Sequence, residues 1–262
     1  MNGQPIGIFD SGVGGTSIWK EIHKLLPHEN TIYLADSKNA PYGEKSEEEI
    51  LRLCIKNTEF LLGKGCKLIV VACNTATTNA IDQLRKLYKV PFIGIEPAIK
   101  PAALLSRSKI VGILATKGTL NSKLFHSTAD NHAHGIRIIE QEGTGLVPLI
   151  EEGKIDTEET RQLLIKYLKP MRDAGIDHLV LGCTHYPYLI PLLKELLPEH
   201  ITIIDSGEAV ARQTRFVLEK NGTLNSTKEI GRSIFHTNME ASTLGRFLVD
   251  SADIIEVSYL EF

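Results

Sequence analysis

The sequence has no run of about 18 consecutive apolar residues, the length that an apolar helix needs to span a membrane. Its beginning, MNGQPIGIFD, also lacks the cationic stretch and long apolar core of an export signal, so we expect a cytoplasmic protein without a membrane partner. The net charge is only −3, which gives no general attraction to nucleic acid. A site can still be locally positive, so small acidic ligands are not excluded.

Cysteine is also scarce, since only four occur among 262 residues. In a chain without an export signal we expect no structural disulfides. No C-x-x-C pair and no Cys/His pair at zinc spacing is present, so we expect no metal site. Cys54 recurs with Ile50 and Leu61 at helical spacing after a capping box of Ser46 and Glu49, which predicts a core position. Cys66, in the turn GKGCK, is interpreted as incidental.

What the chain does contain, with 42% hydrophobic residues, is a series of short aliphatic runs separated by segments of helical periodicity. This alternation is typical of an α/β fold in which a parallel sheet lies between helices. In such sheets ligands bind outside the carboxyl ends of the strands. The predicted strands are 6–9, 31–35, 67–72, 91–95, 109–115, 136–140, 178–182 and 201–205.

A weak internal duplication appears when the ends of these strands are aligned. GIFDSGVGG parallels GILATKGTL, VVACNTATTNA parallels VLGCTHYPYLI, and PFIGIE parallels ITIIDSG. We therefore predict two similar lobes, each a mostly parallel sheet flanked by helices, with the active site in the cleft between them. The first lobe is expected to comprise residues 1–97 and 208–262 and the second residues 98–207.

The two remaining cysteines, Cys73 and Cys183, occupy equivalent strand ends in the two halves. Each alone could be a small buried hydrophobe that closes its strand. Their matched positions and their polar neighbours, Asn74-Thr75 and Thr184-His185, favour a functional role instead. Two facing lobes would place one thiol on either side of a shared cleft.

The segment DSGVGGTS, residues 10–17, follows the first predicted strand and could cradle a phosphate at a helix N-terminus. Asp36 lies at the distance at which dinucleotide-binding folds carry a ribose-binding acid. Ser17 replaces the third glycine of that pattern, which disfavours nucleotide binding. Asp10 and Ser11 also suit a turn or a helix cap.

Three further segments have alternative interpretations. Pro41, Tyr42 and Gly43 suit an ordinary turn, although their loop would face the cleft. The Cys-x-His pair in CTHYPYL also suits a thiol hydrolase. The histidines of residues 126–134 have no acidic or cysteine partner at metal spacing, so we expect a solvated helix and loop.

Four of these segments together, FDSGVGG, APYG, ACNTAT and GCTHYP, resemble the glutamate racemase family. This resemblance implies a cofactor-independent amino-acid racemase that supplies D-glutamate for bacterial peptidoglycan and forms a homodimer. Aspartate racemases share the two cysteine motifs in looser form. The N-terminal extension of members activated by a cell-wall precursor has no counterpart before Ile6, so we expect no such activation.

The resemblance also implies roles for individual residues. Cys73 would act on D-glutamate and Cys183 on L-glutamate, with Asp10, Asp36 and His185 helping the thiols to exchange protons. The residues that it implies for substrate binding are Asp10, Ser11, Pro41, Tyr42, Gly43, Asn74, Thr75, Thr116, Thr119, Glu152, Thr184 and His185.

Physical chemistry favours two bases for this reaction, because a proton leaves one face of the α-carbon and another arrives at the opposite face. A thiol, with a pKa of about 8.5, serves as either acid or base after modest stabilisation. No pyridoxal lysine motif is evident, so fixed hydrogen-bond donors must stabilise the carbanion. The rival interpretations are a two-lobed amino-acid binding protein, which needs no thiols, and a hydrolase that uses only Cys183 and His185.

Overall fold

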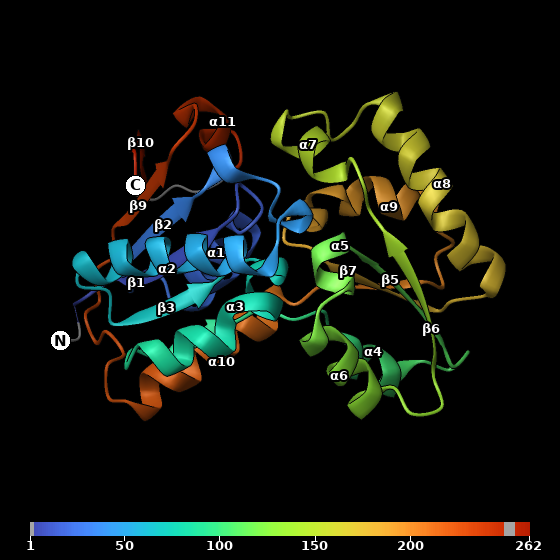
Figure 1. Ribbon diagram of the computed structural model, residues 1–262, viewed down its shortest axis with the longest axis horizontal. Helices are drawn as coiled ribbons and strands as arrows, with labels where there is room; N and C mark the ends of the chain where they lie inside the picture. Colours follow the sequence, from blue (N-terminus) through green and yellow to red (C-terminus); the bar gives the residue numbers. More distant parts are fainter. Residues whose placement is uncertain (1–2, 249–254) are drawn as a thin grey trace.

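The computed structural model describes residues 3–248 and 255–262, which form two parallel sheets flanked by helices (Figure 1). The first sheet has six strands in the order β10-β9-β2-β1-β3-β4, and all of its neighbouring strands are parallel. Its strands are β1 (Ile6–Asp10), β2 (Thr31–Ala35), β3 (Leu68–Val71), β4 (Phe92–Gly94), β9 (Ser233–Thr237) and β10 (Ile255–Tyr259).

The second sheet has four parallel strands in the order β6-β5-β7-β8. They are β5 (Ile110–Ala115), β6 (Arg137–Glu142), β7 (His178–Gly182) and β8 (Thr202–Ile204). This order repeats the order β2-β1-β3-β4 of the first sheet, so the duplication inferred from the sequence is confirmed at the level of topology. The α/β fold with two similar lobes is likewise confirmed.

Helices connect the strands in both lobes, and their ends follow local sequence signals. Ser46 caps one helix by accepting a hydrogen bond from the backbone N–H of Glu49, as the capping box predicts. The helices are α1 (Thr16–Leu25), α2 (Glu47–Gly63), α3 (Asn74–Leu87), α4 (Ile99–Leu105), α5 (Lys117–Leu120), α6 (Lys123–His132), α7 (Leu146–Glu151), α8 (Glu158–Ala174), α9 (Ile190–Leu196), α10 (Gly207–Lys220) and α11 (Ala241–Gly245), with short 3₁₀ turns η1 (Ser37–Asn39), η2 (Tyr42–Glu44) and η3 (Tyr186–Leu189).

The predicted strands all occur, with ends that differ from the prediction by at most two residues. Strands β9 and β10 were not predicted. Their sequences, SIFHT and IEVSY, mix polar and apolar residues, and only alternate positions of β9 are buried. These strands lie at one edge of the first sheet, and α10 packs against α1 in the same lobe (Figure 1). The lobe boundaries near residues 97 and 208 stay a prediction.

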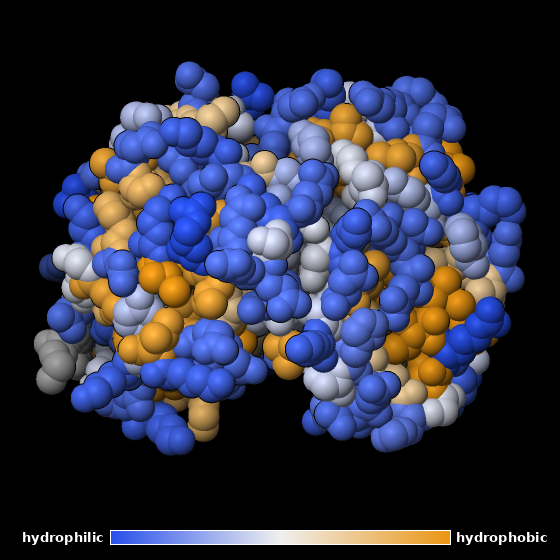
Figure 2. Space-filling model, in the orientation of Figure 1, coloured by the Kyte–Doolittle hydropathy of each residue, from blue (hydrophilic) through white to orange (hydrophobic). Residues whose placement is uncertain are grey.

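A continuous buried cluster includes residues of both sheets, such as Ile8 and Leu181, together with Ile150 of α7. The lobes therefore pack against each other as well as within themselves. The face seen in Figure 2 is mostly hydrophilic, with apolar patches on both halves and a notch between them at the lower edge. In the part of the chain that the structure describes, no helix is both long enough and apolar enough to cross a membrane.

Candidate active site

Cys73 lies where β3 leaves the first sheet and α3 begins. The four residues of β3 are buried, and Cys73 is the N-cap of α3, so its sulfur faces backbone N–H groups of the first helical turn. Its Sγ accepts a hydrogen bond from the N–H of Ala76 at 3.5 Å and lies 3.8 Å from Oγ of Ser11. A helix N-terminus stabilises negative charge, so the Ala76 contact favours the thiolate and opposes the effect of burial.

Cys183 follows β7 in the second sheet, at the position equivalent to Cys73. Its Sγ lies 3.7 Å from Nδ1 of His185, and the other ring nitrogen, Nε2, lies 2.6 Å from Oε1 of Glu151 on α7. Cys183 and His185 are buried. The carboxylate thus orients the imidazole toward the sulfur.

Both thiols line one cavity between the lobes. Its volume is about 10 Å³, roughly the room that one water molecule needs. Apart from Val147, each residue that lines this cavity was predicted from the sequence as a site residue. The lining consists of Ser11, Pro41, Tyr42, Gly43, Cys73, Asn74, Thr75, Thr116, Val147, Cys183, Thr184 and His185.

Asp10 is completely buried and links the two halves of the site. Its carboxylate accepts hydrogen bonds from the backbone N–H groups of Ser11 at 2.7 Å and Gly15 at 2.5 Å, and from Oγ1 of Thr184 at 3.3 Å. Burial raises the pKa of Asp10, although the nearby His185 and the backbone donors of Gly15 and Ser11 oppose the shift. The Asp10 carboxylate and the Cys73 thiol also interact electrostatically, since each affects the pKa of the other.

The two thiols have different electrostatic surroundings. Burial raises the pKa of Cys73 well above its ordinary value, and the Asp10 charge raises it further. Burial alone would lower the pKa of His185, but its contacts with Cys183 and Glu151 outweigh burial and raise it well above the usual value. Burial thus disfavours a thiolate at Cys73, whereas the contacts of His185 favour the protonated ring beside Cys183.

Asn74 has the least satisfied polar side chain of the cavity wall. It is 2% exposed, and neither its Nδ2 nor its Oδ1 has a hydrogen-bond partner. A buried amide without partners costs free energy, about 1–3 kcal/mol for each unsatisfied group. A polar ligand in the cavity would supply the missing partners.

Three threonine hydroxyls join the lobes beside the cavity. Oγ1 of Thr75 lies 2.8 Å from Oγ1 of Thr116 and 3.3 Å from Oγ1 of Thr119, and the latter two lie 3.0 Å apart. Thr116 lines the cavity, whereas Thr119 is fully buried and contacts it only through this cluster. The structure therefore brings Thr119 close to the site but does not place it on the cavity wall.

Asp36 lies behind the cavity wall and not on it. Its buried carboxylate accepts a hydrogen bond of 2.5 Å from the Tyr42 hydroxyl, and Tyr42 stands between it and the cavity. Its side chain contacts Asn39, Tyr42, Asn238 and Lys56, and neither site thiol is among these partners. The expectation that Asp36 assists proton exchange at the cysteines thus has no contact to support it.

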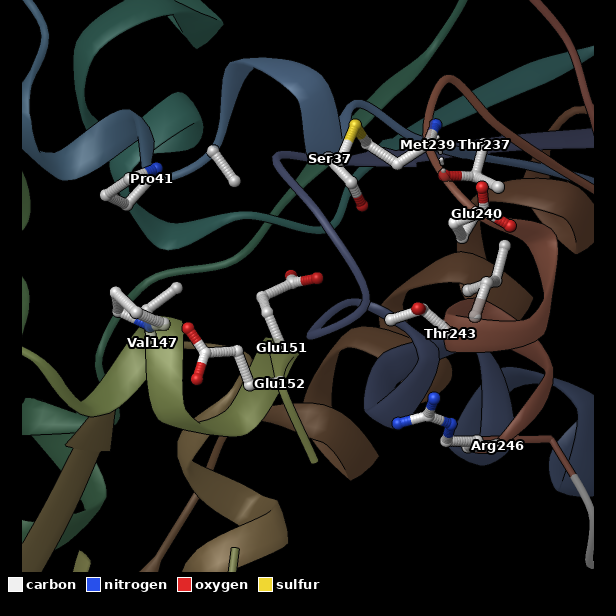
Figure 3. A pocket seen from close by; sticks show the side chains of 13 residues that line it. Ser37, Pro41, Val147, Glu151, Glu152, Thr237, Met239, Glu240, Thr243 and Arg246 are labelled. Carbon is white, nitrogen blue, oxygen red and sulfur yellow. Dashed lines mark hydrogen bonds between the residues drawn. The ribbon is translucent and has the colours of Figure 1, made fainter. Parts of the chain in front are cut away.

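The position of Glu152 differs from the prediction. Its carboxylate pairs with Lys154 at 2.7 Å, and the Glu152 side chain is more than half exposed. It faces a neighbouring pocket of about 400 Å³ instead of the cavity with the thiols (Figure 3). Glu151, one residue earlier on α7, contacts His185 and also accepts the backbone N–H of Val13 at 2.8 Å. Successive helical residues point in directions about 100° apart, so only one of the two can face the site.

The glycine-rich loop after β1 serves packing against the other lobe. A Cβ atom at Gly12 would collide with the Glu151 carboxylate, and one at Gly14 would collide with the His185 ring. The N–H groups of Val13 and Gly15 bind carboxylates of the protein itself. These contacts explain the glycines without a phosphate and agree with the expectation that the loop does not bind a nucleotide.

The predicted histidine segment is a helix and loop, with α6 ending at His132. Within the described ranges, no group of three or more His, Cys, Asp or Glu side chains is arranged to hold a metal ion. Cys54 is fully buried on α2, as predicted. Burial raises the pKa of the Cys66 thiol to about 12, so it is inert.

Residues 6–214 match the model of the Asp/Glu/hydantoin racemase family. The chain belongs to this family. It is therefore an isomerase of the racemase class. A glutamate racemase of Stutzerimonas stutzeri (strain A1501) is 50% identical over 223 residues, which cover 85% of this chain and 84% of the relative. A glutamate racemase of Pseudomonas putida (strain KT2440) is 46% identical over 245 residues, 93% of this chain and 92% of the relative.

Solved structures agree with this assignment. The racemase superposes on the Escherichia coli glutamate racemase in complex with L-glutamate and the activator UDP-MurNAc-ala with a TM-score of 0.85 and 34% identity, covering 97% of this chain and 99% of that one. A glutamate racemase isoform of Bacillus anthracis gives a TM-score of 0.88 at 30% identity, and the match covers 100% of this chain and 98% of that one. The resemblance inferred from the sequence motifs is thus confirmed.

Proposed function

We propose that this racemase interconverts L-glutamate and D-glutamate, with Cys73 and Cys183 as the two acid/base residues. The observation that carries the proposal is the single small cavity lined by two buried thiols, one from the end of each equivalent strand. A binding protein has no use for this arrangement, and a hydrolase needs only one thiol. The names of the relatives supply the substrate.

In the proposed reaction, one sulfur acts as a thiolate and removes the α-proton, forming an S–H bond as the C–H bond breaks. The electron pair moves into the α-carboxylate, and the opposite thiol then returns its proton to the other face of the carbon. The imidazolium of His185 attracts negative charge on Cys183, while Cys73 holds its proton. In this proposal, Cys183 is the base that acts on L-glutamate and Cys73 is the base that acts on D-glutamate.

The reverse direction requires the opposite distribution of protons. Cys73 must lose its proton, and the Asp10 carboxylate, whose charge acts on this thiol, is the acceptor in this proposal. Asp10 also lies close enough to His185 for the two charges to interact, so the positions of the protons in the two halves are coupled. We propose that Asp10 and His185 exchange protons with the thiols in this way.

The developing negative charge needs donors at fixed positions, because hydrogen bonds stabilise charge best in a site that excludes water. The unpaired amide of Asn74 and the hydroxyls of Ser11, Thr75 and Thr184 face the cavity and suit this role. Pro41, Tyr42 and Gly43 would complete the substrate site. Since the cavity has room for only about one water molecule, the lobes must separate before glutamate enters.

The same resemblance to bacterial glutamate racemases leads us to propose a supply of D-glutamate for peptidoglycan in the cytoplasm. A homodimer without an added cofactor is part of this proposal. Glutamate is preferred over aspartate on the basis of the relatives' names.

The test is chiral chromatography of L-glutamate and D-glutamate incubated with the protein, without pyridoxal phosphate. We expect Cys73→Ala and Cys183→Ala each to abolish racemisation, whereas Cys66→Ala, which removes a buried thiol outside the cavity, leaves turnover within about twofold. In deuterated water, product formed in either direction should carry deuterium at the α-carbon. Normal turnover by either active-site variant would overturn the two-base proposal.

The hydrolase alternative has one specific feature in its favour, namely the Cys183–His185–Glu151 arrangement. A chromogenic ester separates the two functions. A hydrolase would form an acyl-enzyme at Cys183 and would not need Cys73, whereas the racemase requires both thiols.

A further inference from the structure

We propose that Asn238 is a positioning residue for the reaction, which holds the Asp36 carboxylate and thereby the substrate loop. The substrate loop is defined here as residues 36–43, which end in Pro41, Tyr42 and Gly43 on the cavity wall. This inference rests on the proposed function for its kinetic test, and it also has a test that does not involve glutamate.

Asn238 lies at the loop because of the strand order of the first sheet. Strand β9 pairs in parallel with β2, and Thr237 is opposite Ala35 in the register. The next residues along each strand, Asn238 and Asp36, therefore leave the sheet side by side. Ser37 and Met239, which follow them, lie together on one wall of the neighbouring pocket (Figure 3).

The side-chain amide of Asn238 uses both of its ends on the substrate loop. Its Nδ2 donates to Oδ1 of Asp36 at 2.6 Å, and its Oδ1 accepts the backbone N–H of Lys38 at 2.9 Å. The residue is 4% exposed, so water does not replace these contacts. Neither bond is part of the regular hydrogen bonding of a helix or strand.

The Asp36 carboxylate links Asn238 to Tyr42, which lies on the cavity wall. Its Oδ2 accepts the Tyr42 hydroxyl at 2.5 Å, and its Oδ1 also accepts Nδ2 of Asn39 at 2.8 Å. The Tyr42 oxygen in turn accepts Nδ2 of Asn57 at 3.2 Å. Tyr42 is 1% exposed and lines the cavity, so its position depends on the hydrogen-bonded group behind it.

Charged side chains of α2 and η1 lie near the hydrogen-bonded residues Asn238, Asp36 and Tyr42. Lys56 of α2 lies 3.6 Å from Oδ1 of Asp36, and Lys38 of η1 pairs at the surface with Glu261 of the C-terminal segment. Asp36 is therefore the only carboxylate among the charged groups that contact Asn238 directly in the described part of the chain. A second carboxylate at position 238 would create a like-charged pair.

The decisive variant is Asn238→Asp, which has nearly the same shape but replaces the donor by a carboxylate. Two carboxylates in contact repel unless they share a proton, and one of them then has a strongly raised pKa. At about pH 8 we expect the KM for glutamate to rise about tenfold or more relative to the wild type, with a smaller change in kcat. At about pH 6 the shared proton restores the hydrogen bond, and the excess in KM should fall by about half or more.

Two further variants separate positioning from general stability. Asn238→Ala removes both hydrogen bonds without adding charge, so its increase in KM should not depend on pH. Asn131→Asp makes the same chemical change at an exposed site on α6 and should leave KM unchanged at both pH values. Thermal melting of each variant reports any loss of folded protein.

The test without glutamate is limited trypsin digestion, because Lys38 and Lys45 flank the part of the loop that reaches the cavity. At about pH 8, Asn238→Asp should be cut after these lysines at least about threefold faster than the wild type or Asn131→Asp. A wild-type protein that does not turn over glutamate would contradict the proposed function. The digestion would still test whether Asn238 holds the substrate loop. Unchanged KM, or unchanged cleavage at both lysines, in folded Asn238→Asp would overturn this inference.

Discussion

The replacement Glu151→Gln tests the electrostatic basis of the site, because it keeps the shape of the side chain and removes its charge. Oε1 of Glu151 lies 2.6 Å from Nε2 of His185, and in this pair His185 is buried and Glu151 is partly buried. Contacts with Cys183 and with Glu151 overcome the effect of burial and raise the pKa of His185. Without the charge at position 151, this pKa must fall.

The size of the effect follows from the distance and the burial. An opposite charge within about 4–6 Å shifts a pKa by about 1–3 units, and each unit corresponds to about 1.4 kcal/mol. Since the imidazolium is the form that stabilises thiolate at Cys183, the alkaline limb of kcat/KM for L-glutamate should move about 1–3 pH units toward acid. Well above the shifted limb the rate should then fall by up to about tenfold for each unit of the shift.

The same change has a consequence for stability. The pKa of His185 is raised in the folded state, so its contribution to stability is complete below the unfolded value of about 6.5 and disappears as pH rises through the folded pKa. The melting temperature of Glu151→Gln should therefore lie below that of the wild type near pH 6, and the difference should shrink at alkaline pH.

The assay is the initial rate of racemisation, followed by circular dichroism across the pH range. The matched control is Glu152→Gln, one residue later, whose carboxylate pairs with Lys154 outside the cavity and should not affect the profile. A shift in Glu152→Gln without one in Glu151→Gln would refute the assignment of Glu151 to the site.

Asn74→Leu removes a buried amide that has no partner, so we expect unchanged or higher thermal stability but a KM for glutamate that is about tenfold higher or more; a lower melting temperature with unchanged KM would contradict this interpretation. Gly14→Ala places a methyl group against the His185 ring, so it should lose about 1–3 kcal/mol of stability together with most activity. Gly63→Ala, with no atom within 4 Å of the added Cβ, is the control, and equal melting temperatures for the two alanine variants would show that the contact is not tight.

Much of the fold could be predicted from local patterns. The aliphatic runs ending in Asp10, Cys73 and Cys183 had to become buried parallel strands, and their polar followers had to lie at the carboxyl ends. Strand β9 could not be recognised in this way, because only alternate residues of this strand are buried. Strand β10 is mostly exposed and has even less of a signal.

Other parts of the site depend on contacts between distant segments. The choice between Glu151 and Glu152 is set by the direction in which α7 presents each side chain to the first lobe, and both belong to the same short sequence EEG. The separation of Asp36 from the thiols by Tyr42 depends on how the loop folds back, and the role proposed for Asn238 depends on β9 lying beside β2.

By itself, the sequence determined the two duplicated α/β halves, the pair of thiols and most of the residues that surround them. Hydrophobic periodicity and the polar residues that follow each strand are local properties, so they can be recognised in the sequence. Tertiary structure alone decided that Glu151 orients His185, and that Gly12 and Gly14 leave room for these two side chains. These features arise where the two lobes meet, and the packing of one surface against another is not encoded in the spacing of residues along either.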